Sequence, residues 1–158
     1  MIQKFISASD FKFSISRLPK TSFYVQEMNL PGISLGKIYI PNANKKFPIH
    51  GDEVEYDQLT LTIAADEKLA SFKEIFNWII ALGRPKTFEG YQEFKDETGL
   101  YSDATITLLD NSKNPSISLS FRDIFPISLG EINFNLKNTD TPVTTFPVTF
   151  AYTSYEFV

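Results

Sequence analysis

The chain has 158 residues, with 15 basic and 19 acidic side chains and a formal net charge of −4 at pH 7. Hydrophobic residues make up 42% and aromatic residues 15%, a composition that excludes a disordered chain. The absence of cysteine excludes disulfides and thiolate metal sites, and the lack of any Lys/Arg cluster disfavours tight binding to nucleic acid.

Alternating apolar and polar residues predict two strands near the N-terminus, at residues 11–15 and 22–28. The Leu-Pro-Gly sequence at 30–32 is a turn signal, because Pro presets φ and Gly accepts a positive φ. The first part of the chain is therefore expected to be a pair of short strands followed by a turn.

Residues 33–49 predict a long, irregular hairpin with a Pro-Asn loop at its tip. Ile38, Ile40 and Phe47 give this hairpin an apolar surface that is expected to be exposed. A turn is predicted at residues 50–52, where His-Gly-Asp closes the hairpin.

Residues 54–64 predict the clearest strand, and residues 66–82 predict one amphipathic helix. Asp66 suits the N-cap, Gly83 suits the C′ position, and Pro85 prevents continuation. At about 100° per residue, the following side chains share one arc and are expected to face the core: Leu69, Phe72, Ile75, Phe76, Ile79, Ile80 and Leu82.

The rest of the chain predicts a long loop at 84–99 and then strands only. Alternation marks four of these strands, at 104–108, 117–121, 132–136 and 145–152. Turns are predicted between them at 110–115, 124–128 and 138–142. Pro147 cannot donate to a ladder, so its strand is expected to be an edge there or to carry a bulge.

These elements predict one domain, residues 1–158, built as an antiparallel β-sandwich or barrel with one flanking amphipathic helix. The N-terminus lacks the apolar core of a signal peptide. No stretch reaches the ~18 apolar residues that a membrane span needs.

No constellation for catalysis accompanies this scaffold. His50 is the only histidine, and it has no nucleophile motif beside it, so a plain turn histidine is favoured. The acidic run at 52–57 lacks the internal glycine of a calcium loop and is interpreted as a solvated strand edge. We therefore expect no catalytic residues, no cofactor and no metal, and a protein that is not an enzyme.

Two features indicate contacts with other chains. Trp78 lies near the edge of the helix's apolar arc, so either a wide core reaches it or it contacts another subunit. The polar strand faces carry Ser, Thr and Asn with few charges, which β-propensity explains as well as a face turned toward other copies or a wet lumen.

The order of these features resembles the tail tube proteins of contractile-tailed bacteriophages, over residues 11–157. The resemblance rests on the turn at 30–32, the hairpin with Pro41 and Asn44, and the sequence Gly-Asp at 51–52. It continues with the strand and helix that follow, with Asn77-Trp78 inside the helix. Late in the chain it includes Phe125-Pro126, the sequence Leu-Gly-Glu-Ile at 129–132, and the closing strand at 145–150.

The resemblance implies a structural subunit that forms rings, expected to be hexameric, which stack around a lumen that conducts DNA. It implies as partners further copies of the chain, the tail sheath protein, the baseplate and tube-initiator proteins, and the tape measure protein and genomic DNA in the lumen. The implied location is the tail of the virion, assembled in the host cytoplasm.

The same resemblance suggests which residues make these contacts. The hairpin is expected to reach the adjacent ring through Ile38, Ile40, Asn44 and Phe47. Trp78, Phe146 and Pro147 are the candidates for contacts between subunits. Two alternatives stay open: a tube-initiating or baseplate-hub-proximal protein of the same fold, and a monomeric β-sandwich that binds a ligand.

Overall fold

The computed structural model covers residues 1–158 and describes residues 5–6, 10–21, 24–83, 92, 99–137 and 142–158. Within these residues the chain forms nine strands and one helix. They are β1 (Phe11–Ile15), β2 (Val25–Met28), β3 (Ile33–Pro41), β4 (Lys46–Tyr56), β5 (Leu59–Ala64), α1 (Ala70–Gly83), β6 (Ser102–Leu109), β7 (Pro115–Leu129), β8 (Thr145–Ala151) and β9 (Ser154–Phe157). The predicted mainly antiparallel β fold with one helix is confirmed.

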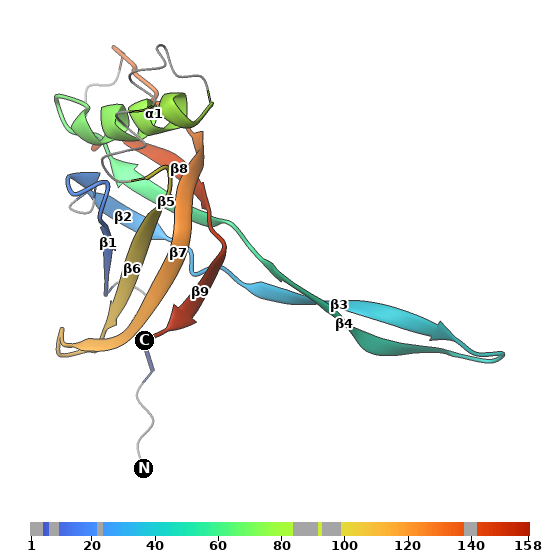
Figure 1. Ribbon diagram of the computed structural model, residues 1–158. Coiled ribbons are helices and arrows are strands. Elements are labelled where there is room, and N and C mark those ends of the chain that lie inside the picture. Colours follow the sequence, from blue (N-terminus) through green and yellow to red (C-terminus); the bar gives the residue numbers. More distant parts are fainter. Residues whose placement is uncertain (1–4, 7–9, 22–23, 84–91, 93–98, 138–141) are drawn as a thin grey trace.

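Seven strands form one curled antiparallel sheet around the core. Six of them follow one another in the order β1-β6-β7-β8-β5-β2, and β9 also pairs with β7. The 15-residue β7 joins the two halves, because its first part pairs with β6 and β9 and its last part pairs with β8. The helix α1 lies across one end of this sheet, and the hairpin β3–β4 projects away from it (Figure 1).

A bulge in β7 replaces the turn that was predicted at residues 124–128. Leu119 and Phe121 point into the core before it, and Ile124 does so after it, so the buried positions change from odd to even numbers. Asp123 has a φ of 54°, and the ladder to β6 slips at this point. The extra residue restores the apolar side to the core and lets the strand continue where a turn was expected.

The helix begins at Ala70, four residues later than predicted, because Leu69 has a φ of 51° and interrupts it. Asp66 still stabilises the start, since its Oδ1 accepts a hydrogen bond from the Ala70 N–H at 2.8 Å. The expected left-handed C-cap is wrong, because Gly83 is the last helical residue and has no positive φ. Of the predicted apolar arc, Ile75 is fully buried and Phe72, Ile79 and Leu82 pack against the core, whereas Phe76 is 46% exposed.

Two predicted strands differ from the structure, and one observed strand was not predicted. The expected strand at 54–64 is divided, because β4 ends at Tyr56 and β5 begins at Leu59. The expected strand at 132–136 is absent, and Phe134 and Leu136 are exposed there. The last predicted strand, at 145–152, corresponds to β8, and β9 beyond it was not predicted.

The strand containing Pro147 is only locally an edge. β8 lies between β5 and β7, yet the pairs with β7 end at Leu129 and Val148, one residue before the proline is reached. The Gly130 N–H donates to the Pro147 carbonyl oxygen. The N–H and C=O of one residue in an antiparallel strand point to the same neighbouring strand, so the N–H that Pro147 lacks would also point toward β7, just past its last residue.

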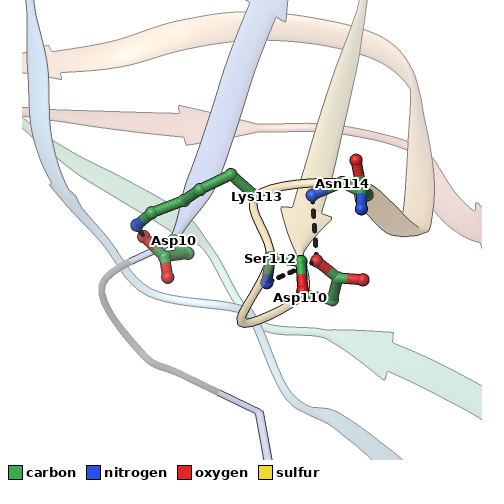
Figure 2. A network of polar contacts seen from close by, with 5 residues as sticks. All are labelled: Asp10, Asp110, Ser112, Lys113 and Asn114. Atoms are coloured by element: carbon green, nitrogen blue, oxygen red, sulfur yellow. Dashed lines mark hydrogen bonds and ion pairs between the residues drawn. The ribbon is translucent and has the colours of Figure 1, made fainter.

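A tight polar turn joins β6 to β7 and holds the start of β1 (Figure 2). The Asp110 carboxylate accepts hydrogen bonds from the Ser112 N–H at 2.8 Å and the Asn114 N–H at 2.9 Å. Lys113, with a φ of 66°, forms an ion pair with Asp10 just before β1. The turn predicted at 110–115 is therefore confirmed. Most of the loop predicted at 84–99 lies outside the described residues, as does most of the turn predicted at 138–142.

Candidate assembly surfaces

The hairpin β3–β4 is the most exposed part of the described chain. Every residue of β3 is exposed, and in β4 only Gly51 is half-buried. A two-stranded ribbon has only marginal stability alone in water, because it buries neither of its faces. Eight of its large apolar side chains are between 45% and 61% exposed: Ile33, Leu35, Ile38, Tyr39, Ile40, Phe47, Ile49 and Val54.

Most of these side chains form two sets of opposed pairs. At the outer end, Ile38 lies opposite Ile49 and Ile40 opposite Phe47, and we call these four residues the tip face. Next to the sheet, Ile33 lies opposite Tyr56 and Leu35 opposite Val54, and we call these four the root face. Directly opposed residues of an antiparallel pair share one side of the ribbon, so each set forms one continuous apolar patch.

A bulge separates the two sets. The register moves from Leu35 opposite Val54 to Lys37 opposite His50, so three residues of β4 face Gly36 alone. A Cβ at Gly51 would lie 3.0 Å from the carbonyl carbon and oxygen of Gly36, so a side chain there would crowd the backbone of β3. The turn predicted at 50–52 is therefore wrong: the Gly-Asp sequence bends the strand within the hairpin.

The base of the hairpin is tied to the C-terminal strands. The Tyr152 hydroxyl donates to the Asp57 carbonyl oxygen at 2.6 Å, and the Tyr155 hydroxyl donates to the Pro31 carbonyl oxygen at 2.9 Å. The ring of Tyr56 lies edge-on to both tyrosine rings, at centroid distances of 5.9 and 5.6 Å. Both ends of the hairpin are thus anchored to one aromatic cluster, which fixes the direction in which it leaves the sheet.

Desolvation in this cluster raises the pKa of the Tyr152 phenol, with smaller contributions from the nearby Tyr155, Asp57 and Tyr56. The hydroxyl therefore keeps its proton, which it needs as a donor. The Leu-Pro-Gly sequence before β3 does not form the predicted turn, and the Gly32 carbonyl oxygen accepts a hydrogen bond from the Asp57 N–H at 3.0 Å. A Cβ at Gly32 would lie 2.9 Å from Asp57 Oδ2.

Charge is distributed unevenly along the hairpin. Its outer half carries Lys37, Lys45 and Lys46 and no acidic residue. The acidic residues Asp52, Glu53, Glu55 and Asp57 are exposed and lie in the bulge and along the root of the hairpin. Within the residues that the structure describes, no group of three or more His, Cys, Asp or Glu side chains is arranged to hold a metal ion.

A second surface is the outward face of β1, β6 and β7. Its neighbouring positions carry hydroxyl side chains, with Ser14 beside Thr105 and Thr105 beside Ser120. The next row places Thr107 beside Ser118, and their hydroxyl oxygens lie 3.4 Å apart. These rows are polar, as the strand patterns predicted, and each ends at a charged residue: Lys12 lies beside Thr107, and Glu156 of β9 lies beside Ser120.

The structure places the four predicted ring-to-ring contacts together. Ile38, Ile40 and Phe47 belong to the tip face, and Asn44 lies in the loop that joins β3 to β4. Whether they touch another ring stays a prediction. Tyr152 and Tyr155 were missed by the sequence analysis, because their partners lie 95 and 124 residues away along the chain.

Two of the predicted subunit contacts are not at the surface. Trp78 is 1% exposed and Phe146 is fully buried, both within the chain's own core. The Trp78 indole N–H donates to the Leu100 carbonyl oxygen at 2.9 Å, and its ring packs against Phe150. The core explanation for Trp78 is therefore confirmed, and both residues are withdrawn as contact candidates. Pro147 is exposed and stays a candidate.

One cleft of the described surface is lined by charged groups that already have partners within the chain. It has a volume of about 350 Å³ and is lined by Arg17, Asp103 and Asp123 among others. Its charged groups are engaged within the chain: Arg17 donates to the Gly99 carbonyl oxygen, and Asp103 accepts from the Asp123 N–H at 3.3 Å. Among the described residues, no helix has the length and apolar character to cross a bilayer.

One family model and several solved structures match this chain over nearly its whole length. The family model described as phage tail tube protein matches residues 3–158. No curated protein matches the chain. Among solved structures, a chain of the sheath–tube complex of an extracellular contractile injection system (PVC) in its extended state superposes with a TM-score of 0.70. It is 15% identical, over 99% of this chain and 93% of that one.

Two further solved chains come from the anti-feeding prophage. One belongs to its tube-terminating cap, with a TM-score of 0.72 and 14% identity over 100% of this chain and 93% of that one. The other belongs to its baseplate, with a TM-score of 0.66 and 13% identity over 100% of this chain and 97% of that one. At these identities the likeness establishes the fold.

Proposed function

The chain belongs to the phage tail tube protein family, and we propose that it is a structural subunit whose hexameric rings stack into a tube that conducts DNA. The observation that carries the proposal is the hairpin β3–β4, which leaves the sheet with eight large apolar side chains exposed. Contiguous exposed apolar surface of this kind marks a protein interface. Neighbouring subunits that cover the hairpin would account for its exposed apolar side chains.

The remaining sheet edges support the same arrangement. β1 and β2 end the strand order, and β9 pairs on one side only, so each offers unpaired backbone groups. A head-to-tail contact between copies removes such edges when the rotation closes into a ring. Stacking does not close, and it therefore gives a filament, with Ile38, Ile40, Asn44 and Phe47 reaching the adjacent ring and Pro147 contacting a neighbouring subunit.

The lumen of such a tube must let DNA slide without gripping it. Basic linings attract phosphates by counterion release, whereas hydroxyl side chains do not. The outward face of β1, β6 and β7 and the net charge of −4 suit this role. The tape measure protein and genomic DNA would pass through the lumen. The sheath protein would surround the tube, which would assemble in the host cytoplasm and become part of the virion tail.

Electron microscopy of the purified chain tests the proposal. We expect rings or rods by negative stain and a matching high-mass species by size exclusion. The double variant Ile38→Glu/Phe47→Glu is expected to keep the parent's thermal transition, because both side chains are about half exposed, and to lose the rods. The control Lys37→Glu alters charge on the other side of the hairpin and is expected to keep them. A parent chain that stays an 18.0 kDa monomer at high concentration contradicts the proposal.

A tube-initiating or baseplate-proximal role is the second candidate. It is favoured by the likeness to a chain from a baseplate and to one from a tube-terminating cap. An initiator differs in its product, because it forms one ring and stops. Single rings from the unmodified chain, elongated only when a second tube protein is added, would support this alternative.

A further inference from the structure

The outward face of β1, β6 and β7 continues onto β9, and we call the outward residues of these four strands the hydroxyl face. Glu156 lies beside Ser120 and Ser154 lies beside Arg122, so β9 extends the rows that begin on β1. Within the described strands, its uncharged members include Ser14, Thr105, Thr107, Ser118, Ser120 and Ser154, and its charged members are Lys12, Asp103, Arg122 and Glu156. Two positive charges therefore accompany two negative charges, and the face as a whole is neutral.

Arg122 is the cation that lies among carboxylates on the hydroxyl face. Its Nη2 donates a hydrogen bond to Glu156 Oε1 at 2.7 Å, which joins β7 to β9. The hydrogen bond to Glu156 and the charge of that carboxylate raise the pKa of the guanidinium above its usual value, with smaller contributions from Asp103 and Asp123. Glu156 is therefore the main group that balances the charge of Arg122.

The ion pair lies where a passing molecule would meet it. The side chains of Arg122 and Glu156 are 64% and 57% exposed. An ion pair in such a position adds little to the stability of a fold, because water and salt screen it. Its larger effect is on the charge that the hydroxyl face presents to a partner.

We propose that Glu156 prevents the tube lumen from binding nucleic acid, by occupying the guanidinium of Arg122 within the same chain. The inference rests on the proposed function, in which the hydroxyl face lines the lumen, and it adds the residue on which free passage depends. A guanidinium is well suited to phosphate, because its planar N–H groups match two phosphate oxygens. With Glu156 in place, a phosphate must displace a carboxylate from those N–H groups.

A closed ring would amplify the effect of an unpaired arginine. Each copy brings its own Arg122 to the same channel, and charges of one sign around a channel concentrate counter-ions within it. Each phosphate that a cation neutralises also releases condensed counterions, so the attraction would rise with the number of copies along the tube. One carboxylate per subunit removes that attraction throughout the tube.

Lys12, the second cation of the hydroxyl face, differs from Arg122 in both place and chemistry. It lies beside Thr107 on β1, two strands away from β7. An ammonium is a strongly hydrated point charge and lacks the planar fork that matches a phosphate. Lys12 is unchanged in every variant below, so it contributes the same background to each measurement.

Three variants of the full-length chain test the inference. Glu156→Gln keeps the shape of the side chain but leaves the charge of Arg122 uncompensated by it. The control Glu67→Gln changes the net charge by the same one unit and lies just before α1, away from the hydroxyl face. The double variant Arg122→Gln/Glu156→Gln removes both charges. All three side chains are exposed, so each variant is expected to keep the parent's thermal transition and its rods.

Binding of a linear, fluorescent single-stranded DNA oligonucleotide to the assembled rods measures the effect. At about 50 mM salt, Glu156→Gln rods are expected to bind it at least about tenfold more tightly than parent rods, and the gain should fade toward about 200 mM. Rods of Glu67→Gln and of the double variant should behave like the parent. A covalently closed circular duplex has no end that can enter a tube, so it should show no gain with any variant.

Equal binding by Glu156→Gln and Glu67→Gln overturns the inference, and so does a gain that persists in the double variant. An equal gain for the closed circle overturns it as well, because the hydroxyl face would then lie outside the tube. Glu156→Thr, which extends the row of hydroxyl side chains, replaces Glu156→Gln if that variant fails to form rods. If the unmodified chain forms neither rings nor rods, the proposed function itself fails, whereas rods with unchanged binding overturn only this inference.

Discussion

Gly130 and Pro147 are in direct contact at the end of the β7–β8 ladder. The Gly130 N–H donates to the Pro147 carbonyl oxygen at 2.7 Å. A Cβ built on Gly130 would lie 2.3 Å from Cγ and 2.5 Å from Cδ of the proline ring. The absence of a side chain on one residue therefore makes room for the ring of the other, and Pro147 is accommodated in an interior strand.

Gly130→Ala is expected to lower the free energy of unfolding by about 1–3 kcal/mol, because the new methyl group overlaps the proline ring. Chemical denaturation followed by circular dichroism measures this change. Gly83→Ala is the matched control: nothing lies within 4 Å of its Cβ position, and it ends α1. Alanine there is expected to be neutral or to stabilise by up to about 1 kcal/mol. Equal effects at the two glycines would show that the Pro147 contact is not the cause.

Removing the two hydroxyls at the hairpin base is expected to loosen the hairpin more than the sheet. In Tyr152→Phe/Tyr155→Phe both hydrogen bonds to residues 57 and 31 are lost, at about 0.5–1.5 kcal/mol each. Hydrogen exchange should quicken most at the amides of β3 and β4 and least in β5 and β8. The control Tyr39→Phe, at the half-exposed tip, should match the parent. Uniform quickening would instead indicate global destabilisation.

Alkaline pH is expected to destabilise the fold through Tyr152. Its pKa is raised above the ordinary value of 10.0, chiefly by desolvation. Above pH 10 the unfolded chain therefore loses this proton before the folded chain does, and stability falls as pH rises. Thermal melts between pH 9 and 11 should show a smaller decline for Tyr152→Phe than for the parent. Parallel curves would mean that the phenol does not contribute.

The β6–β7 turn depends on one carboxylate. Asp110→Ala is expected to lower the free energy of unfolding by about 1–3 kcal/mol, because two backbone N–H groups lose their acceptor. Asn111→Ala, one residue further along the same exposed turn, is expected to change it by less than ~0.5 kcal/mol. Urea denaturation of both variants measures the difference, and similar losses would contradict the role of the Asp110 side chain.

Trp78 provides an internal test of which surfaces assemble. It is the only tryptophan and is 1% exposed, so its emission should be blue-shifted in the isolated subunit. Assembly into rods should leave that emission unchanged, because the residue belongs to the subunit's own core. Iodide should fail to quench it in either state. A shift of the emission maximum on assembly would return Trp78 to the subunit interface.

Residue periodicity predicted the elements whose burial follows a simple repeat. The helix and the strands of the sheet other than β9 were found because their apolar residues recur every three to four or every two positions. Backbone exceptions were missed. A positive φ at Leu69 delays the helix, and one at Asp123 lets β7 continue through residues that resemble a turn.

The hairpin was predicted, but its extent was not. Gly-Asp at 51–52 has the composition of a turn, and only the register with β3 reveals that Gly51 faces Gly36 inside the ribbon. The anchoring by Tyr152 and Tyr155 joins residues far apart in sequence, which no local pattern reports. For the same reason, the sequence alone could not decide whether Trp78, at the edge of the predicted arc, belongs to the core or to a subunit contact.

The bulge at Asp123 gives β7 a mechanical consequence for a subunit in a long filament. Because a single strand belongs to both halves of the sheet, a pull on one half reaches the other through covalent backbone. No flexible connection intervenes at that point to absorb the load. The two halves are therefore expected to respond to axial strain as one stiff body, and extension of the filament must come from the joints between subunits.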